Sequence, residues 1–436
     1  MGKGTGSAVG GKGLPHQEAR AGVNKMTALV ITVFLLVYLG MLFGGLPFLQ
    51  LDRTGIALLG AIVLVASQVI SVEEAYRSLH APTLILLFSF MVISAQLRLG
   101  GFYSWTALRI VSLNTQPSIL LGTLIVVAAC LSAVFSNDIV CLAMAPVVAE
   151  ICLARRLNPI PFLIGLACAA NIGSAATLIG NPQNMLIGQT LNMSFGRYLL
   201  VTSIPVVLSL VVTWSLIMAL RYRQGWIAPE SSTQPTYDGR CGQDTPLDIW
   251  QTGKGLLVAT TLFVAFLFLP WPRELMALAA AGLLLTSRRL HSSRMLGFVD
   301  WQLIILFMGL FVVNHAMQQT ELPSRVVEAL STYGFDLRTQ GPLFITSFVL
   351  SNIVSNVPAV MLLLPTTVGE HAGTVLAISS TLAGNLLIVG SIANIIVVNE
   401  AAHKGIKIDW REHAKLGVPV TVASLAISST YFYLLS

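Results

Sequence analysis

The sequence predicts an all-α polytopic membrane protein that is built from two inverted repeats. The 436 residues are 55% hydrophobic and only 10% charged, whereas soluble domains average about 25% charged residues. Apolar runs that are long enough to cross a bilayer recur along the whole chain. A short polar motif interrupts the apolar sequence once in each half of the chain, which is typical of transporters with internal repeats.

The duplicated motif is LSAVFSND in the first half and LSNIVSNV in the second half. Its matching positions share one offset of 219 residues: Leu131, Ser132, Ser136, Asn137 and Pro146 correspond to Leu350, Ser351, Ser355, Asn356 and Pro365. Further along, Gly180 and Asn184 match Gly390 and Asn394 at an offset of 210. Because the matching residues are polar, glycine or proline, a chance match between two apolar sequences is a poor explanation.

The chain divides into a tail, two repeats and a linker. Residues 1–25 are Gly-rich and polar, and we expect a disordered tail there. Repeat 1 covers 26–222, a polar cytoplasmic linker covers 223–253, and repeat 2 covers 254–436. The expected apolar segments of repeat 1 are 27–47, 55–72, 82–99, 118–135, 139–154, 162–189 and 198–222. Those of repeat 2 are 254–270, 274–290, 301–318, 342–354, 357–369, 374–399 and 414–435.

The two segments beside the second motif predict a re-entrant hairpin. Residues 342–354 and 357–369 supply 13 residues each, and a spanning helix needs about 20 residues at ~1.5 Å each. We assign the longer first pair to a hairpin by symmetry. Each repeat then has five transmembrane helices, one re-entrant hairpin and a broken helix that faces it. Since five is odd, the second repeat is inverted relative to the first.

Orientation follows from the distribution of Lys and Arg. Sixteen of the 25 basic residues collect on one predicted side, which we therefore place in the cytoplasm of a bacterial inner membrane. Both termini and the second hairpin then face outward. Residues 101–116 and 322–338 are too short to span and predict interfacial helices, the first with Tyr103 and Trp105 at headgroup level.

Composition also excludes several classes of function. The net charge of +6 comes from loops between apolar segments, so it indicates orientation and no nucleic-acid partner. The five cysteines form no C-x-x-C pair, and no disulfide or zinc framework is expected. The chain carries no H-E-x-x-H and no G-x-S-x-G, so we expect no enzyme activity, no catalytic residue and no cofactor.

The first motif forms the tip of hairpin 1. Ser132 and Ser136 are four residues apart and would share one helix face. With Asn137 they offer hydroxyl, amide and carbonyl oxygens, which suit Na⁺ or the hydrogen bonds of an oxyanion. Asp138 is the only acidic residue near the predicted midplane. It is either a proton or cation carrier or simply the N-cap of the following helix.

The second polar cluster is ANIGSAATLIGNPQN, from Ala170 to Asn184. Its glycines and Pro182 predict a break in the helix over 173–184, because proline removes a backbone hydrogen bond. A broken helix exposes N–H groups at one new end and carbonyls at the other. Its counterpart in repeat 2 covers 384–394. The candidate substrate-binding residues at the tips and breaks are Ser136, Asn137, Thr177, Asn181, Asn184, Ser355, Asn356, Asn385, Ser391 and Asn394.

These motifs resemble the ion transporter superfamily, which includes arsenite permeases, sodium–dicarboxylate symporters, citrate–metal carriers, sodium/proton antiporters and P-proteins. In its divalent-anion symporters, S-N-T tips and facing helix breaks bind Na⁺. The resemblance implies coupling-ion ligands at Ser132, Ser136, Asn137 and Gly180, and at Ser351, Ser355, Asn356 and Gly390. It also implies, as one alternative, a homodimer.

The tips here depart from S-N-T. They read Ser136-Asn137-Asp138 and Ser355-Asn356-Val357, and the carboxylate of Asp138 disfavours a dianion. This pattern resembles the arsenite-permease branch, which implies proton-coupled export of arsenite or antimonite, with Asp138 as the coupling residue. Sodium-coupled uptake of a dicarboxylate, sulfate or a related anion is the first alternative. Sodium/proton antiport is the second. Na⁺ or H⁺ would be the coupling ion, and no other metal is expected.

Overall fold

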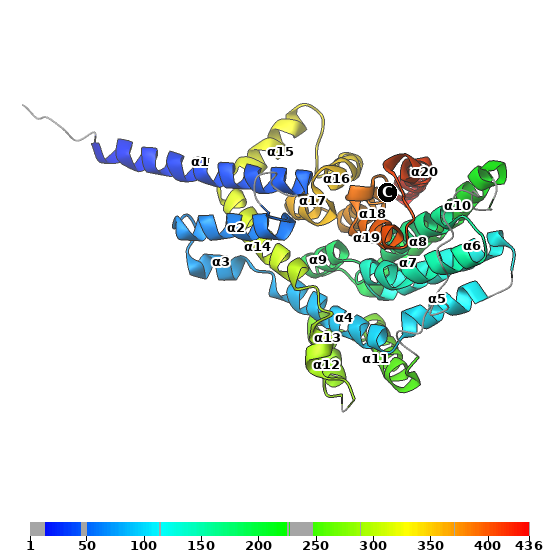
Figure 1. The fold of residues 1–436 in the computed structure, drawn as a ribbon. Coiled ribbons are helices and arrows are strands. Elements are labelled where there is room, and N and C mark those ends of the chain that lie inside the picture. The colour runs from blue at the N-terminus through cyan, green and yellow to red at the C-terminus, as the bar shows by residue number, and fades with distance from the viewer. Residues whose placement is uncertain are drawn as a thin grey trace, which may run out of the picture. The chain divides into compact units, whose positions relative to one another are not determined.

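The computed structural model describes residues 14–44, 50–112, 115–224, 226, 247–287, 289–369 and 371–435. Every regular element in these ranges is a helix, and no strand occurs among them (Figure 1). The chain divides into two compact units. One unit comprises Met1–Leu79 with Ile305–Val326, and the other comprises His80–Ile304 with Val327–Ser436.

The smaller unit contains α1 (Leu14–Phe43), α2 (Arg53–Ala66), α3 (Val72–Ser78) and most of α14 (Trp301–Gln319). A glycine lets α14 approach α2 closely, because a Cβ on Gly309 would lie 2.7 Å from the backbone of Ala57. The hydroxyl of Tyr38 on α1 donates to Asn314 Oδ1 on α14 at 2.9 Å. Helices of the first repeat therefore pack against a helix of the second.

The larger unit contains the remaining helices. They are α4 (Ala81–Leu99), α5 (Phe102–Ser112), α6 (Pro117–Val134), α7 (Asn137–Ala154), α8 (Pro159–Ser174), α9 (Pro182–Thr190), α10 (Phe195–Gln224), α11 (Ile249–Phe268), α12 (Arg273–Leu285), α13 (Ser292–Leu296), α16 (Gln340–Val354), α17 (Asn356–Leu363), η1 (Leu364–Thr366), α18 (Ala372–Ala383), η2 (Ile388–Gly390), α19 (Ile392–His403) and α20 (Trp410–Leu435). The short α15 (Leu322–Thr332) begins in one unit and ends in the other.

Within the larger unit, α4 packs against α11 and α12. Gln96 Nε2 of α4 donates to Gln251 Oε1 of α11 at 2.7 Å. This arrangement mirrors the smaller unit, because α4 corresponds to α14, and α11 and α12 correspond to α1 and α2. In each unit, one repeat therefore contributes a helix pair and the other repeat contributes the helix that packs on it.

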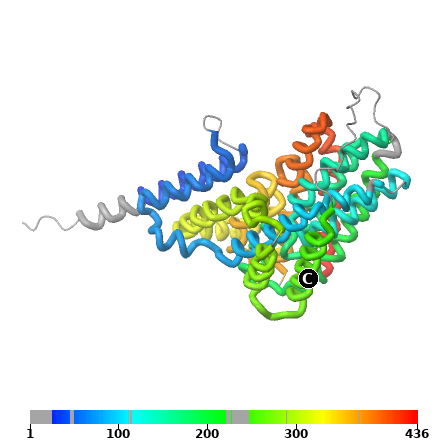
Figure 2. The backbone as a smooth tube through the Cα atoms, turned by 60° about the horizontal axis from the view of Figure 1, so that its bottom comes forward, coloured from blue at the N-terminus to red at the C-terminus, as the bar shows by residue number. Residues whose placement is uncertain are grey.

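The two hairpins and two broken helices all lie in the larger unit. α6 and α7 form hairpin 1 and both pack along α8, as Figures 1 and 2 show. α16 and α17 form hairpin 2 and both pack against α18. The breaks fall between α8 and α9 and between α18 and α19, as expected from residues 173–184 and 384–394. The helix starts repeat with the sequence offsets: Asn137 and Asn356 differ by 219, and Pro182 and Ile392 by 210.

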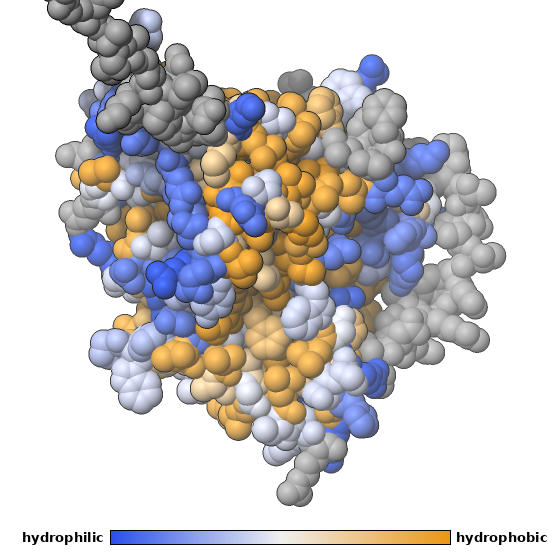
Figure 3. All heavy atoms as spheres, turned by 90° about the vertical axis from the view of Figure 1, so that its left-hand side faces the viewer, coloured by the Kyte–Doolittle hydropathy of each residue, from blue (hydrophilic) through white to orange (hydrophobic). Residues whose placement is uncertain are grey.

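Eight described helices are long and apolar enough to cross a membrane: α1, α4, α6, α7, α10, α11, α14 and α20. Apolar side chains also cover much of the exposed surface, and Figure 3 shows one face where they gather in a band bordered by polar groups. Burying such a surface in water-free lipid is favourable. The protein is therefore a multi-pass membrane protein with inverted repeats.

Several expected boundaries need correction. The disordered tail is wrong for residues 14–25, which continue α1, because Gln17–Arg20 are good helix formers and Pro15 fits the first turn. Residues 1–13 lie outside the described residues. α10 and α11 reach into both ends of the expected linker 223–253, most of which also lies outside them. α2 and α12 have only 14 and 13 residues, shorter than the expected 55–72 and 274–290.

Short helices, α5 and α15, occupy the places of the two expected interfacial helices, but one of the two aromatic residues of α5 is not at the surface. Trp105 is exposed, as expected for a headgroup anchor. Tyr103 is instead buried and packs edge-on against Phe135 at the end of α6, with ring centroids 6.0 Å apart. Tyr103 therefore anchors α5 to hairpin 1.

Candidate functional site

Hairpin tip 1 meets break 1 through backbone atoms. The N–H of Asn137 donates to the carbonyl of Gly180 at 3.2 Å. A Cβ on Gly180 would lie 2.8 Å from Ser132 O and 2.3 Å from Ser174 O, so only glycine permits this approach. Thr177 Oγ1 donates to the carbonyl of Ala133 at the end of α6. The tip and the break therefore form one unit of backbone packing.

Break 1 satisfies its own backbone with asparagine side chains. Pro182 is the first residue of α9, where its missing N–H costs nothing. Asn181 is the N-cap, and its Oδ1 accepts from the N–H of Asn184 at 2.8 Å. Asn184 Nδ2 donates to the carbonyls of Ser174 at 3.3 Å and Thr177 at 3.0 Å, which α8 leaves unpaired as it ends.

Break 2 repeats this arrangement at the expected offset of 210. Asn394 Nδ2 donates to the carbonyls of Gly384 at 2.7 Å and Leu387 at 3.0 Å. Ser391 is the N-cap of α19, at the position of Asn181 in repeat 1. Gly390 lies against hairpin 2, because a Cβ there would lie 3.2 Å from Asn352 Oδ1. The two breaks are therefore structural copies of each other.

The two breaks also contact each other by a reciprocal exchange. Ser391 Oγ donates to Asn171 Oδ1 at 3.1 Å, and Asn181 Nδ2 donates to Thr381 Oγ1 at 3.2 Å. Asn171 corresponds to Thr381 and Asn181 to Ser391 at the same offset of 210. Each contact is thus the repeat-equivalent of the other, as a pseudo-twofold axis between the repeats requires.

Asn171 joins tip 1 to break 2. Asn137 Nδ2 donates to Asn171 Oδ1 at 2.9 Å. Asn171 Nδ2 donates to Asn385 Oδ1 at 2.9 Å and to Asn394 Oδ1 at 3.3 Å. Asn171 therefore joins candidate residues from both halves of the chain in one buried polar network, namely Asn137, Asn385, Ser391 and Asn394.

Several buried oxygens at the tips lack a hydrogen-bond partner. In repeat 1 these are Ser132 Oγ, Asn137 Oδ1 and Asp138 Oδ1. In repeat 2 they are Ser351 Oγ, Asn352 Oδ1 and Asn356 Oδ1. A buried unpaired polar group costs about 1–3 kcal/mol. The Ser and Asn atoms recur at equivalent positions, so unpaired oxygens are a shared feature of the two tips, and oxygen is the ligand atom that hard cations prefer.

Asp138 is not a helix N-cap. Ser136 occupies the N-cap of α7, and Asp138 lies in the first helical turn. There the positive end of the helix dipole favours a carboxylate, yet its Oδ1 is covered and unpaired. The capping alternative is therefore wrong, and the carboxylate stays available to a proton or a cation.

One detail of the predicted tips is also wrong. α6 ends at Val134 and Phe135 is extended, so Ser132 and Ser136 do not share a helix face. Ser355 has a φ of +78°, which turns the chain sharply between α16 and α17. Neither Ser136 nor Ser355 makes a side-chain capping bond. The prediction assumed continuous helices, whereas the turn begins at Phe135 in tip 1 and at Ser355 in tip 2.

The helix ends at the site nearly balance in charge, and tip 1 adds the carboxylate of Asp138. Four helices begin at it, α7, α9, α17 and α19, and four end at it, α6, α8, α16 and α18. Their positive and negative ends offset one another. Among the described residues, no Lys or Arg side chain donates to the network. His413 of α20 is the titratable neighbour of break 2, and its Nε2 lies 3.1 Å from Asn385 O.

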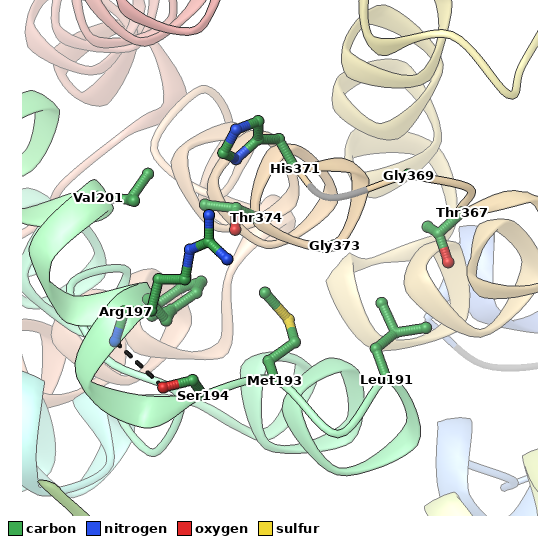
Figure 4. Close-up of a pocket in the computed structure, with 11 residues that line it drawn as sticks. Leu191, Met193, Ser194, Arg197, Val201, Thr367, Gly369, His371, Gly373 and Thr374 are labelled. Carbon is green, nitrogen blue, oxygen red and sulfur yellow. Dashed lines mark hydrogen bonds between the residues drawn. The ribbon is translucent and has the colours of Figure 1, made fainter. Parts of the chain in front are cut away.

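A separate cavity of about 340 Å³ lies beside the network, where α10 begins and the connection from η1 leads into α18. Its lining includes Ser194, Arg197, His371 and Thr374, and Figure 4 shows Arg197 extending toward Thr374 and His371. Tyr198 also lines it and connects it to break 1, because its hydroxyl donates to Ala175 O at 2.9 Å.

The sequence prediction missed Thr381 and His413 of this site, and it included Asn171 only as a hydrogen-bonding member of the cluster from Ala170 to Asn184. Asn171 and Thr381 lie one turn before the ends of α8 and α18, and His413 comes from α20. Their matching offset of 210 could have identified Asn171 and Thr381 as a pair. Nothing in the sequence placed His413 beside break 2.

Comparison with known proteins identifies the family. The family model described as citrate transporter matches residues 34–375. The chain is 29% identical over 434 residues to the 46 kDa membrane protein of Mycobacterium leprae, covering 94% of this chain and 99% of that protein. It is 27% identical over 457 residues to the silicon efflux transporter LSI3 of Oryza sativa subsp. japonica, covering 88% and 93%.

The fold is also similar to a solved transporter structure. The crystal structure of the Alcanivorax borkumensis YdaH transporter matches with a TM-score of 0.52 and 13% identity, covering 93% of this chain and 97% of that one. The inverted repeats, the paired breaks and the family match agree: the chain is a membrane transporter that belongs to the citrate transporter family of the ion transporter superfamily.

Proposed function

We propose that this transporter exports a small uncharged inorganic hydroxide, such as As(OH)₃ or Sb(OH)₃, in exchange for protons bound by Asp138. The observation that carries the proposal is the buried, unpaired Oδ1 of Asp138 beside a network of neutral groups. An ionised carboxylate is costly in such a place unless a proton or a cation accompanies it. Its repeat-equivalent is Val357, so the coupling group occurs in one repeat only.

The chemistry of the network favours an uncharged substrate. The groups that converge are amides and hydroxyls, which both donate and accept hydrogen bonds. A dianion would add charge next to Asp138, and among the described residues no arginine or lysine donates a hydrogen bond to the network that could balance it. A hydroxide with three or four O–H groups matches mixed donors and acceptors. The relative named as a silicon efflux transporter supports this class, since dissolved silicon is also a neutral hydroxide.

Sodium-coupled uptake of a dicarboxylate, sulfate or a related anion is the second candidate. It is favoured by the equivalent unpaired oxygens of Ser132 and Asn137 in repeat 1 and of Ser351 and Asn356 in repeat 2. Two bound Na⁺ ions would satisfy those oxygens and would also balance the charge of an anion. Sodium/proton exchange would use the same oxygens with Asp138.

Flux measurements in proteoliposomes distinguish these candidates. Arsenite, silicic acid and succinate are offered separately under a pH gradient or a Na⁺ gradient. We expect hydroxide flux driven by the pH gradient, and loss of that dependence in Asp138→Asn. Glu328→Gln makes the same acid-to-amide change at an exposed position and serves as the control. Succinate flux that is driven by Na⁺ and is unaffected in Asp138→Asn would refute the proposal and support the second candidate.

A further inference from the structure

The amide of Asn171 has all its hydrogen-bonding positions filled by groups from other elements. Its Oδ1 accepts from Asn137 of tip 1 and Ser391 of break 2, and its Nδ2 donates to Asn385 and Asn394 of break 2. The side chain is only 2% exposed. One neutral side chain thus bonds to tip 1 and to break 2 at the same time.

Thr381 has the same role from the opposite repeat. Its hydroxyl accepts from Asn181 Nδ2 at 3.2 Å and Gln183 Nε2 at 3.3 Å, and it donates to Asn184 Oδ1 at 3.3 Å. It is also 2% exposed. Each residue lies near the end of its own first half-helix and reaches into the break of the other repeat.

We propose that Asn171 and Thr381 contact the substrate and set its selectivity, and that the bonds each of them makes to the break of the other repeat replace those of the substrate when it is absent. This inference rests on the proposed function for the class of substrate. The break asparagines and Ser391 point their polar atoms at these two side chains. A ligand that enters between the breaks must therefore exchange bonds with Asn171 and Thr381.

The exchange has a physical reason. Separating the breaks without a ligand leaves buried amides and hydroxyls unpaired, which is strongly unfavourable. A ligand with several O–H groups restores both the donors and the acceptors at once. A ligand that can only accept cannot replace the donors that these oxygens lose when the breaks separate, which are Ser391 for Asn171 Oδ1 and Thr381 for Asn184 Oδ1. The pair therefore discriminates by the number and kind of hydrogen bonds.

The test combines flux kinetics with ligand-dependent stability of the purified full-length protein. Thr381→Val keeps the shape of the side chain and removes the hydroxyl, and Thr381→Ser restores the hydroxyl. Asn171→Thr places the repeat-equivalent residue at position 171. Asn399→Thr, at an exposed position of α19, is the matched control. Arsenite, silicic acid and succinate serve as probes.

We expect Thr381→Val and Asn171→Thr to raise the apparent KM for the transported probe about tenfold, which is the loss of one or two hydrogen bonds. The stabilisation against heat that the probe gives the wild type should disappear in both variants. Thr381→Ser and Asn399→Thr should behave like the wild type. Unchanged apparent KM in Thr381→Val, with only a lower melting temperature, would overturn the inference and leave these residues a packing role.

Failure of the proposed function gives a different result. If the wild type moves succinate and neither hydroxide, the substrate class is wrong, and the same comparison of KM is made with succinate. If Asn171→Thr does not fold, the pair Thr381→Val and Thr381→Ser decides the question alone.

Discussion

Gly180→Ala tests whether tip 1 and break 1 depend on direct backbone contact. An added Cβ would lie 2.3 Å from Ser174 O, 2.6 Å from Ser174 Cα and 2.8 Å from Ser132 O. Real Cβ atoms essentially never approach another heavy atom within 3.0 Å, and backbone atoms cannot rotate away. The break must therefore move away from the hairpin.

The expected cost follows from this displacement. Overpacking of this kind costs about 1–3 kcal/mol. Separation also weakens the hydrogen bond from Asn137 N to Gly180 O, which contributes about 1 kcal/mol. We therefore expect Gly180→Ala to lower the free energy of unfolding by ~2–4 kcal/mol. Because Gly180 adjoins the unpaired oxygens of tip 1, coupled transport should fall as well.

The measurement is equilibrium unfolding in detergent, followed by flux in proteoliposomes. Gly282→Ala is the matched control, since Gly282 lies inside α12 and a Cβ there would meet nothing within 4 Å. That change should stabilise the protein by up to ~1 kcal/mol, because alanine favours the helix. Equal stability and equal flux in the two variants would refute the steric argument for Gly180.

Two further predictions concern the periphery of the molecule. Glu150 of α7 forms a half-buried ion pair with Lys404, which follows α19. We expect Glu150→Gln to lower the free energy of unfolding by ~1 kcal/mol, and the charge exchange Glu150→Lys with Lys404→Glu to recover part of that loss. Strictly additive effects in the double-mutant cycle would contradict a direct pair. At the start of α3, hydrogen bonds from the backbone N–H and hydroxyl of Ser71 lower the pKa of Glu74, so the capping interaction is complete at neutral pH and is lost as the pH falls through the lowered pKa. Hydrogen-exchange protection of the first amides of α3 should therefore be retained at neutral pH and decrease only in the acidic range where Glu74 becomes protonated, whereas Ser71→Ala should show low protection at every pH.

Much of the architecture is determined by local sequence. The length and spacing of apolar runs predict the helices, because a bilayer requires every backbone group to be paired within a segment. The offset of 219 between Asn137 and Asn356 predicts the paired hairpins, and the offset of 210 between Asn184 and Asn394 predicts the paired breaks. Pro182 is the first residue of α9, as the sequence pattern predicts for a proline at a helix start. These features depend on neighbours in sequence, so pattern alone identifies them.

The roles of individual polar residues were decided by tertiary structure. Asp138 had two explanations in sequence, and only the placement of Ser136 at the N-cap excluded one of them. Asn171 looked like one of several polar residues before the break, yet it joins tip 1 to break 2 through partners as distant as Asn394. Such contacts depend on how the repeats pack against each other. The periodicity of a sequence predicts the buried face of a single helix. It does not predict which asparagines of the two repeats contact each other across a pseudo-twofold axis.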